Sequence, residues 1–286
     1  MPTPFSPLVV GALYPGIERG IKADVLATHA LGGAAFPVCT SHVVAGRGTV
    51  TDVLDVPSDT VSAQLEHLRT TETPTAAKIG IVGASPTVNI LFDHLQTFDG
   101  PIVFDVTLSG PSGEDILEQS GLDALVDRLG EADLVSIRRS DAELLAGMKI
   151  PSLDDAQVAV QRIEQQGAHR VLMRCGRIPT HHFDTESGPP DYAVDLYYDG
   201  DDFALFEAPY LEGLDGLHGR SSGLLLPLLA HMQDGTAPEE ALQNAKGTVT
   251  EALHAAQDAE VDVRSHTFFD SLQYDFTPSA TGNGRP

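Results

Sequence analysis

The feature that most constrains the fold of this chain is a regular alternation of short apolar runs with longer segments of helical pattern. Residues 8–13, 77–82 and 102–108 are mostly apolar, as in buried strands, and a segment with helix-forming features follows each run. Strands of this kind have both faces covered, unlike strands that alternate apolar and polar residues. The order therefore predicts an α/β fold with a central, mostly parallel sheet between two layers of helices.

The rest of the chain continues this order, without a fixed-period repeat or a linker-like run. We therefore expect one domain over residues 1–276 and a polar tail over 277–286. Asp199 and Gly200 predict a hairpin turn between strands at 192–198 and 203–206. Further strands are predicted at 34–39, 50–56, 134–137 and 170–174, helices at 16–31, 58–69, 86–97, 116–129, 141–146, 156–166, 222–232 and 238–256, and an aromatic cluster at Phe268, Phe269, Tyr274 and Phe276.

The charge balance restricts the classes of partner. With 17 Lys and Arg against 41 Asp and Glu, the net charge is −24, which argues against binding to nucleic acid or to an anionic membrane surface. Two cysteines form no disulfide framework, and we expect neither a leader nor a membrane span, so the expected compartment is a reducing cytoplasm. Because the basic residues are mostly arginine, the composition indicates a halophilic protein, or alternatively an acidic protein from an ordinary cell.

Ligands of such sheets bind beyond the carboxyl ends of the strands, so the loops that follow the predicted strands are the candidate site. Asp105 ends one strand and precedes a Ser/Gly loop, where it can hold a metal-bound water near phosphates or simply cap the next turn. Asp141 and Glu143 open a helix, a position that carboxylates favour without any function. Neither loop alone decides between a binding role and a structural one.

A third loop, residues 217–223, leads into a hydrophobic helix. Backbone N–H groups at the start of a helix bind anions, and the Gly and Ser residues here allow a phosphate to approach them. The simplest role of Ser222 is that of a helix cap. No carboxylate or cysteine follows Gly219 in this loop, which weakens a catalytic interpretation.

Together, and in this order, the three loops resemble the ribokinase superfamily, most closely the hydroxymethylpyrimidine and phosphomethylpyrimidine kinase branch, with pyridoxal kinases as near kin. The resemblance extends from about residue 11 to residue 253. It rests on Gly20–Asp24 and "GGGAGIQAD", Lys78–Gly83 and "KIGMLG", Asp105–Gly113 and "DPVM…SG", Ser136–Gly147 and "TPNxxEAELLTG", Val171–Gly176 and "VLVKGG", and His218-Gly219 and "HGTGCT".

The resemblance implies a ribokinase-like three-layer fold that transfers phosphate from ATP, with Mg²⁺, to a primary hydroxyl of a small vitamin-precursor-like substrate. It also implies a homodimer. By position in the motifs, the implied sites are Ser222 for the catalytic base, Arg174, Gly219, Arg220 and Ser221 for the nucleotide, Gly11, Tyr14, Ala45 and Leu108 for the substrate, and Asp105 and Asp141 for the metal.

The departures from the family pattern all fall on its chemistry. Ser222 stands where the family has its base, and a serine hydroxyl takes no proton near neutral pH without a helper. Tyr14 and Ala45 replace a polar Asp and Gln pair, so we expect hydroxymethylpyrimidine to bind poorly. Arg138 replaces an Asn and Arg174 a Lys. Two hypotheses remain: a divergent ATP-dependent kinase, and a non-catalytic homologue that binds a nucleotide or small ligand in a regulatory role.

Overall fold

The computed structural model describes residues 4–45, 49–110, 113–114, 116–181, 190–214, 216–259 and 264–272. Within these residues one sheet of nine strands has the order β3-β2-β1-β4-β5-β6-β7-β8-β9. The pairings from β2 through β1 to β7 are parallel, whereas β3, β8 and β9 run antiparallel to their neighbours. The strands are β1 Pro7–Leu13, β2 Phe36–Ala45, β3 Val50–Asp55, β4 Ala76–Ile79, β5 Ile102–Val106, β6 Leu134–Arg138, β7 Val171–Gly176, β8 Tyr192–Tyr198 and β9 Phe203–Pro209.

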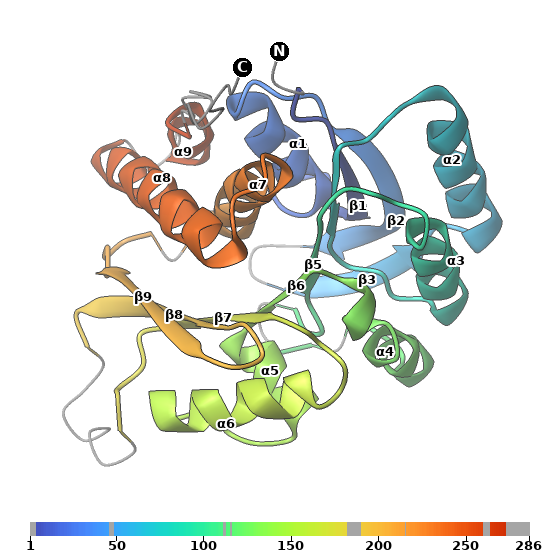
Figure 1. The fold of residues 1–286 in the computed structure, drawn as a ribbon. Helices are drawn as coiled ribbons and strands as arrows, with labels where there is room; N and C mark the ends of the chain where they lie inside the picture. Colours follow the sequence, from blue (N-terminus) through green and yellow to red (C-terminus); the bar gives the residue numbers. More distant parts are fainter. Residues whose placement is uncertain are drawn as a thin grey trace, which may run out of the picture.

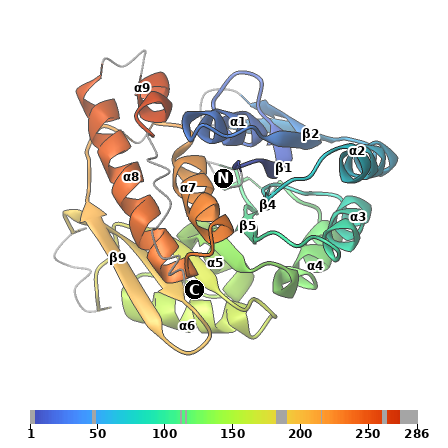
Figure 2. The same ribbon diagram turned by 45° about the horizontal axis from the view of Figure 1, so that its top comes forward.

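Helices cover both faces of this sheet, which confirms the predicted three-layer α/β architecture (Figures 1 and 2). One face carries α1 Ile21–Ala30, α7 Arg220–Gln233, α8 Pro238–Asp258 and α9 Arg264–Asp270. The other carries α2 Ser58–Thr71, α3 Ser85–Leu95, α4 Gln119–Val126, α5 Arg139–Ala146 and α6 Leu153–Glu164, with a 3-10 turn, η1, at Leu129–Glu131. In the part of the chain that is described, no helix is long and apolar enough to cross a membrane.

The strands explain why two hydrophobic cores form. Successive side chains of a strand point to opposite faces, so Leu8 and Val10 of β1 pack into the core beneath α2 and α3, whereas Val9 packs into the core beneath α1 and α7. All three are buried. The continuous apolar run that predicted a covered strand is therefore used on both sides of the sheet.

Three elements differ from their predicted bounds. The helix expected from residue 16 begins at Ile21, because Gly20 adopts φ 56° and bridges back to Leu13, which keeps residues 14–20 in a loop. The strand expected to end at Cys39 continues to Ala45, because its second half pairs with β3. Helix α9 was not predicted, and it contains Phe268 and Phe269 of the aromatic cluster. Tyr274, Phe276 and the tail 277–286 lie outside the described residues, so the domain boundary stays a prediction.

Candidate active site

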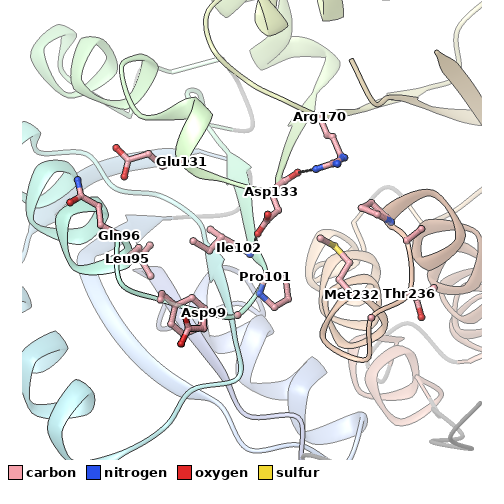
Figure 3. A pocket seen from close by; sticks show the side chains of 15 residues that line it. Leu95, Gln96, Asp99, Pro101, Ile102, Glu131, Asp133, Arg170, Met232 and Thr236 are labelled. Atoms are coloured by element: carbon pink, nitrogen blue, oxygen red, sulfur yellow. Dashed lines mark hydrogen bonds between the residues drawn. The ribbon is translucent and has the colours of Figure 1, made fainter. Parts of the chain in front are cut away.

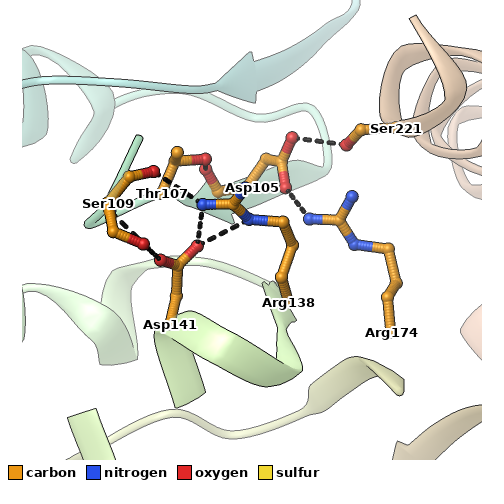
Figure 4. A network of polar contacts seen from close by, with 7 residues as sticks. All are labelled: Asp105, Thr107, Ser109, Arg138, Asp141, Arg174 and Ser221. Carbon is orange, nitrogen blue, oxygen red and sulfur yellow. Dashed lines mark hydrogen bonds and ion pairs between the residues drawn. The ribbon is translucent and has the colours of Figure 1, made fainter. Parts of the chain in front are cut away.

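The carboxyl end of β5 carries the first part of a polar network (Figure 4). Arg174 in β7 donates from Nη2 to Asp105 Oδ1 at 2.6 Å, and the Ser221 hydroxyl donates to Asp105 Oδ2 at 2.6 Å. Burial alone would raise the pKa of Asp105, but Arg174 and Lys78 lower it below its usual value. Asp105 is therefore an ionised carboxylate that ties the first turn of α7 to the middle of the sheet.

Asp141, in the first turn of α5, holds the second part of this network. Its Oδ1 accepts the Ser109 backbone N–H at 3.1 Å and the Ser109 hydroxyl at 2.7 Å. Its Oδ2 accepts Arg138 Nε at 2.8 Å and lies 2.7 Å from Arg138 Nη2. Arg138 Nη2 also donates to the Ser109 carbonyl at 2.7 Å, so Arg138 clamps the loop after β5 onto α5 (Figure 4). Asp141 is completely buried.

A buried charge cluster lies behind Asp105. Lys78 Nζ in β4 is 2.8 Å from Asp24 Oδ1 and 3.6 Å from Asp105 Oδ2. Burial raises the pKa of Asp24, although Lys78 and a hydrogen bond from Ser222 oppose this. Burial works against the charged form of Lys78 as well, but Asp24 and Asp105 together raise its pKa above the usual value. The Ser222 side chain is thus joined to a buried carboxylate, and no helix-cap bond from a side chain is present at this end of α7.

The start of α7 is fixed by tight packing. Gly219 has φ 84°, and a Cβ added there would lie 2.3 Å from Cζ of Phe269, whose ring is buried. A Cβ at Gly223 would lie 2.4 Å from Cζ of Phe268. The aromatic cluster, whose role the sequence left open, therefore supports the helix start that the family motif "HGTGCT" predicts to bind phosphate.

Arginines gather at this end of the sheet although the protein is strongly acidic. Arg19 Nε donates to His218 Nδ1 at 3.0 Å, which requires a neutral imidazole, and burial together with Arg19 lowers the His218 pKa. Arg19 lies within electrostatic range of Arg138 and Arg220, and Arg138 within range of Asp105. With Arg174, four of the 13 arginines surround one site in a chain of net charge −24.

The predicted substrate residues are only partly brought together. Tyr14 is buried in a small apolar cluster that includes Val43, Ile81 and Ile116, so its ring is not open for a ligand to stack on. Ala45 is exposed at the far end of β2, outside this cluster. Val43 takes the place beside Tyr14, and sequence reasoning missed it because the strand was expected to end at Cys39.

The other two predicted substrate residues are packing positions in this structure. A Cβ at Gly11 would lie 3.5 Å from Gly80 Cα, an ordinary contact between neighbouring strands. Leu108 is buried and belongs to the large core on the α2–α6 face rather than to the cluster around Tyr14. Both lie near the network in sequence, but neither reaches Tyr14 in the apolar cluster.

A wide surface depression lies at the opposite edge of the sheet (Figure 3). It has a volume of about 880 Å³ and is lined by Pro101 and Asp133, which precede β5 and β6, and by Met232 and Thr236 around the end of α7. Among the predicted site residues, none lines it. The polar network at the carboxyl edge, and not this depression, is therefore the candidate active site.

Comparison with known proteins decides the family. The pattern of the phosphomethylpyrimidine kinase family matches residues 18–266, and hydroxymethylpyrimidine/phosphomethylpyrimidine kinase from Rhizobium meliloti is 30% identical over 249 residues, 86% of this chain and 89% of the relative. The chain belongs to the phosphomethylpyrimidine kinase family. The predicted resemblance to the ribokinase superfamily is confirmed.

Solved structures of this superfamily share the fold. Phosphomethylpyrimidine kinase from Clostridium difficile 630 superposes with a TM-score of 0.70 at 22% identity, over 87% of this chain and 99% of that one. Pyridoxal kinase from Staphylococcus aureus, in complex with AMP-PCP and pyridoxal, gives 0.74 at 23% identity, with 88% of each chain covered.

The residues present in this member of the family do not fit the implied Mg²⁺ site. Mg²⁺ needs carboxylate oxygens with free lone pairs in octahedral geometry. Both oxygens of Asp141 already accept two donors each, and both oxygens of Asp105 accept a donor beside the cations of Arg174 and Lys78. The described residues hold no group of three or more acidic, histidine or cysteine side chains that could bind a metal.

The same site fits an anion well. Arg174 Nε is buried without a hydrogen-bond partner, and a buried donor of this kind costs about 1–3 kcal/mol when it stays unpaired. A phosphate oxygen beside Arg174 would supply the missing acceptor. The nucleotide residues Gly219, Arg220 and Ser221 lie at the α7 start next to it, with the Arg220 side chain exposed.

Proposed function

We propose that this protein is an ATP-dependent phosphotransferase that acts on the primary hydroxyl of a small vitamin-precursor-like substrate. Its family membership supports this, since the matching relatives are named as hydroxymethylpyrimidine/phosphomethylpyrimidine kinases. The observation that carries the proposal is the meeting of Arg174, the start of α7 and Ser222 at one carboxyl edge of the sheet. Arg174, Arg220 and the first amides of α7 would hold phosphate oxygens there.

Ser222 has the hydrogen-bond geometry of a proton relay. An ionised carboxylate only accepts hydrogen bonds, so the Ser222 hydroxyl must donate its proton to Asp24. The lone pairs of Ser222 Oγ then remain to accept the proton of the substrate hydroxyl. As the substrate oxygen bonds to the γ-phosphorus and the bond to ADP breaks, the substrate proton passes to Ser222 Oγ and the serine proton to Asp24. Burial, which raises the Asp24 pKa, favours this transfer.

The non-catalytic homologue stays as a second candidate because of one observation. Ser222 is only 4% exposed, and it replaces the reactive cysteine of the family motif. A chain that binds the nucleotide but transfers no phosphate would fit this equally.

A transfer assay in high salt distinguishes the two candidates. ATP and a panel of primary alcohols, including pyridoxal and hydroxymethylpyrimidine, would be incubated with the protein, and ADP and the phosphorylated product measured. We expect one alcohol to be phosphorylated and hydroxymethylpyrimidine to be a poor substrate. Nucleotide binding without transfer to any alcohol would favour the non-catalytic homologue, and no nucleotide binding would exclude both candidates.

Two arginines of β7 provide a matched pair for this assay. Arg174→Gln should lower ATP affinity and transfer about 10- to 100-fold, because a charge-assisted hydrogen bond contributes about 1.5–3 kcal/mol. Arg170, just before the amino end of the strand and beside the surface depression, should tolerate Arg170→Gln with unchanged kinetics. Equal losses in both variants would contradict the placement of the site.

We further propose a cytoplasmic homodimer adapted to salt. The dimer rests on the family resemblance and on Val44 and Leu54, whose side chains are half exposed on one face of the β2–β3 hairpin. The salt adaptation rests on the net charge of −24, with lysine at only four positions.

Salt should stabilise this protein. Repulsion among 41 acidic residues opposes the compact state, and salt screens it, so the melting temperature should rise from low to molar KCl. Thermal unfolding measured by circular dichroism checks this, with sucrose as the uncharged control. A melting temperature that is independent of KCl would contradict the salt-adapted interpretation.

A further inference from the structure

Each of the two carboxylates expected to hold a metal has its own arginine instead. Arg138 binds Asp141 through Nε and Nη2, and Arg174 binds Asp105 through Nη2. We propose that these two arginines replace the protein-bound divalent cation, so that the site binds ATP without Mg²⁺ at least as tightly as it binds the magnesium complex. The inference deepens the proposed function, because it takes the ligand to be a nucleotide.

The donor count of each arginine leaves room for phosphate. A guanidinium group carries five N–H donors. Arg138 uses Nε and Nη2 on Asp141 and Ser109, and its Nη1 bonds to no described residue. Arg174 uses Nη2 on Asp105, while its Nε is buried without a partner. Both side chains are thus held in place by a carboxylate on one edge and keep donors on another, an arrangement that suits the oxygens of a phosphate chain.

The acceptor count excludes the metal from the same position. The four lone-pair sites of the Asp141 carboxylate match the four donor contacts that it receives from Ser109 and Arg138. Asp141 is also completely buried, so a cation cannot reach it without displacing Arg138. At Asp105, the cations of Arg174 and Lys78 lie within 2.6 and 3.6 Å of the carboxylate oxygens and would repel a divalent ion.

The sign of the magnesium effect follows from this charge arrangement. Free ATP carries more negative charge than its magnesium complex, because the bound cation cancels part of that charge. A site that supplies carboxylates to the metal prefers the complex, whereas a site lined by arginines prefers the more negative free nucleotide. Four arginines near this site therefore favour free ATP.

Calorimetric titration with ATP tests the inference, once with EDTA and once with excess MgCl₂, at the same ionic strength set by KCl. For the parent protein we expect the dissociation constant in EDTA to equal or lie below the value in MgCl₂. Binding that requires Mg²⁺ would overturn the inference and leave the proposed kinase function intact. Absence of ATP binding under both conditions would overturn both.

Two variants link the result to the arginine–carboxylate pair. Arg138→Asn alone would leave Asp141 buried and unpaired, so the double variant Arg138→Asn, Asp141→Asn removes both charges and keeps neutral hydrogen-bonding groups. We expect it to weaken binding of free ATP about tenfold or more, so that the preference for free ATP is lost. Arg139→Asn is the matched control, since Arg139 donates to the Arg177 carbonyl and to neither carboxylate. An unchanged ratio of the two constants in the double variant would contradict the inference.

Discussion

Replacing Ser222 by alanine is expected to lower kcat of phosphoryl transfer about 10²- to 10⁴-fold, the usual contribution of a general base, with little change in KM for ATP. Ser222 is the hydroxyl that joins the start of α7 to the buried Asp24 carboxylate. Without its oxygen, the substrate proton has no path to Asp24, while Arg174 and the α7 amides still hold the phosphates. Steady-state kinetics with the best alcohol from the assay measure this split between kcat and KM.

A rescue variant separates the relay from a structural role of Ser222. Ser222→Cys restores the residue type of the family motif at nearly the same volume, and it should keep or exceed the parent kcat. Ser222→Ala will also lower stability by about 1–3 kcal/mol, because Asp24 loses a donor, so kinetics are measured well below each melting temperature. An alanine variant with the parent kcat would show that Ser222 moves no proton.

The local pattern predicted most of the fold. A run such as 8–13 is buried on both faces wherever it pairs, and Asp199 with Gly200 can turn a hairpin from local geometry alone, with φ 109° at Gly200. Gly147 ends α5 in the left-handed conformation that was expected of a glycine there. Elements whose bounds depend on distant partners were less accurate, as in β2, whose second half is set by β3.

The candidate site was predicted by position but not by interaction. The motifs placed Asp105, Asp141 and Gly219 at one edge, and the structure brings them together through Ser109 and Ser221. What no local pattern contains is that Arg174 pairs with a carboxylate 69 residues earlier and Arg138 with a carbonyl 29 residues earlier. These long-range pairs decide that the two carboxylates are neutralised by arginine rather than open to a metal.

Gly219→Ala is expected to be the most destabilising of the single substitutions considered. A side chain at φ 84° costs about 1–2 kcal/mol, and its Cβ would lie 2.3 Å from the buried Phe269 ring, an overpacking cost of about 1–3 kcal/mol. Together these should lower the free energy of unfolding by about 2–5 kcal/mol and the melting temperature by roughly 4–20 °C. Thermal and urea unfolding measure both quantities.

Two neighbouring glycines separate the causes of that loss. Gly223→Ala meets Phe268 at 2.4 Å without a left-handed backbone, so it should show the packing part alone, about 1–3 kcal/mol. Gly216→Ala has open space around its Cβ and an ordinary φ, so it should change stability by less than about 0.5 kcal/mol. Because Phe268 and Phe269 position the α7 start, Gly219→Ala should also weaken ATP binding at temperatures where the variant is still folded. A Gly219→Ala protein as stable as Gly216→Ala would mean that the Phe269 ring moves away freely and that α7 is not held by the aromatic pair.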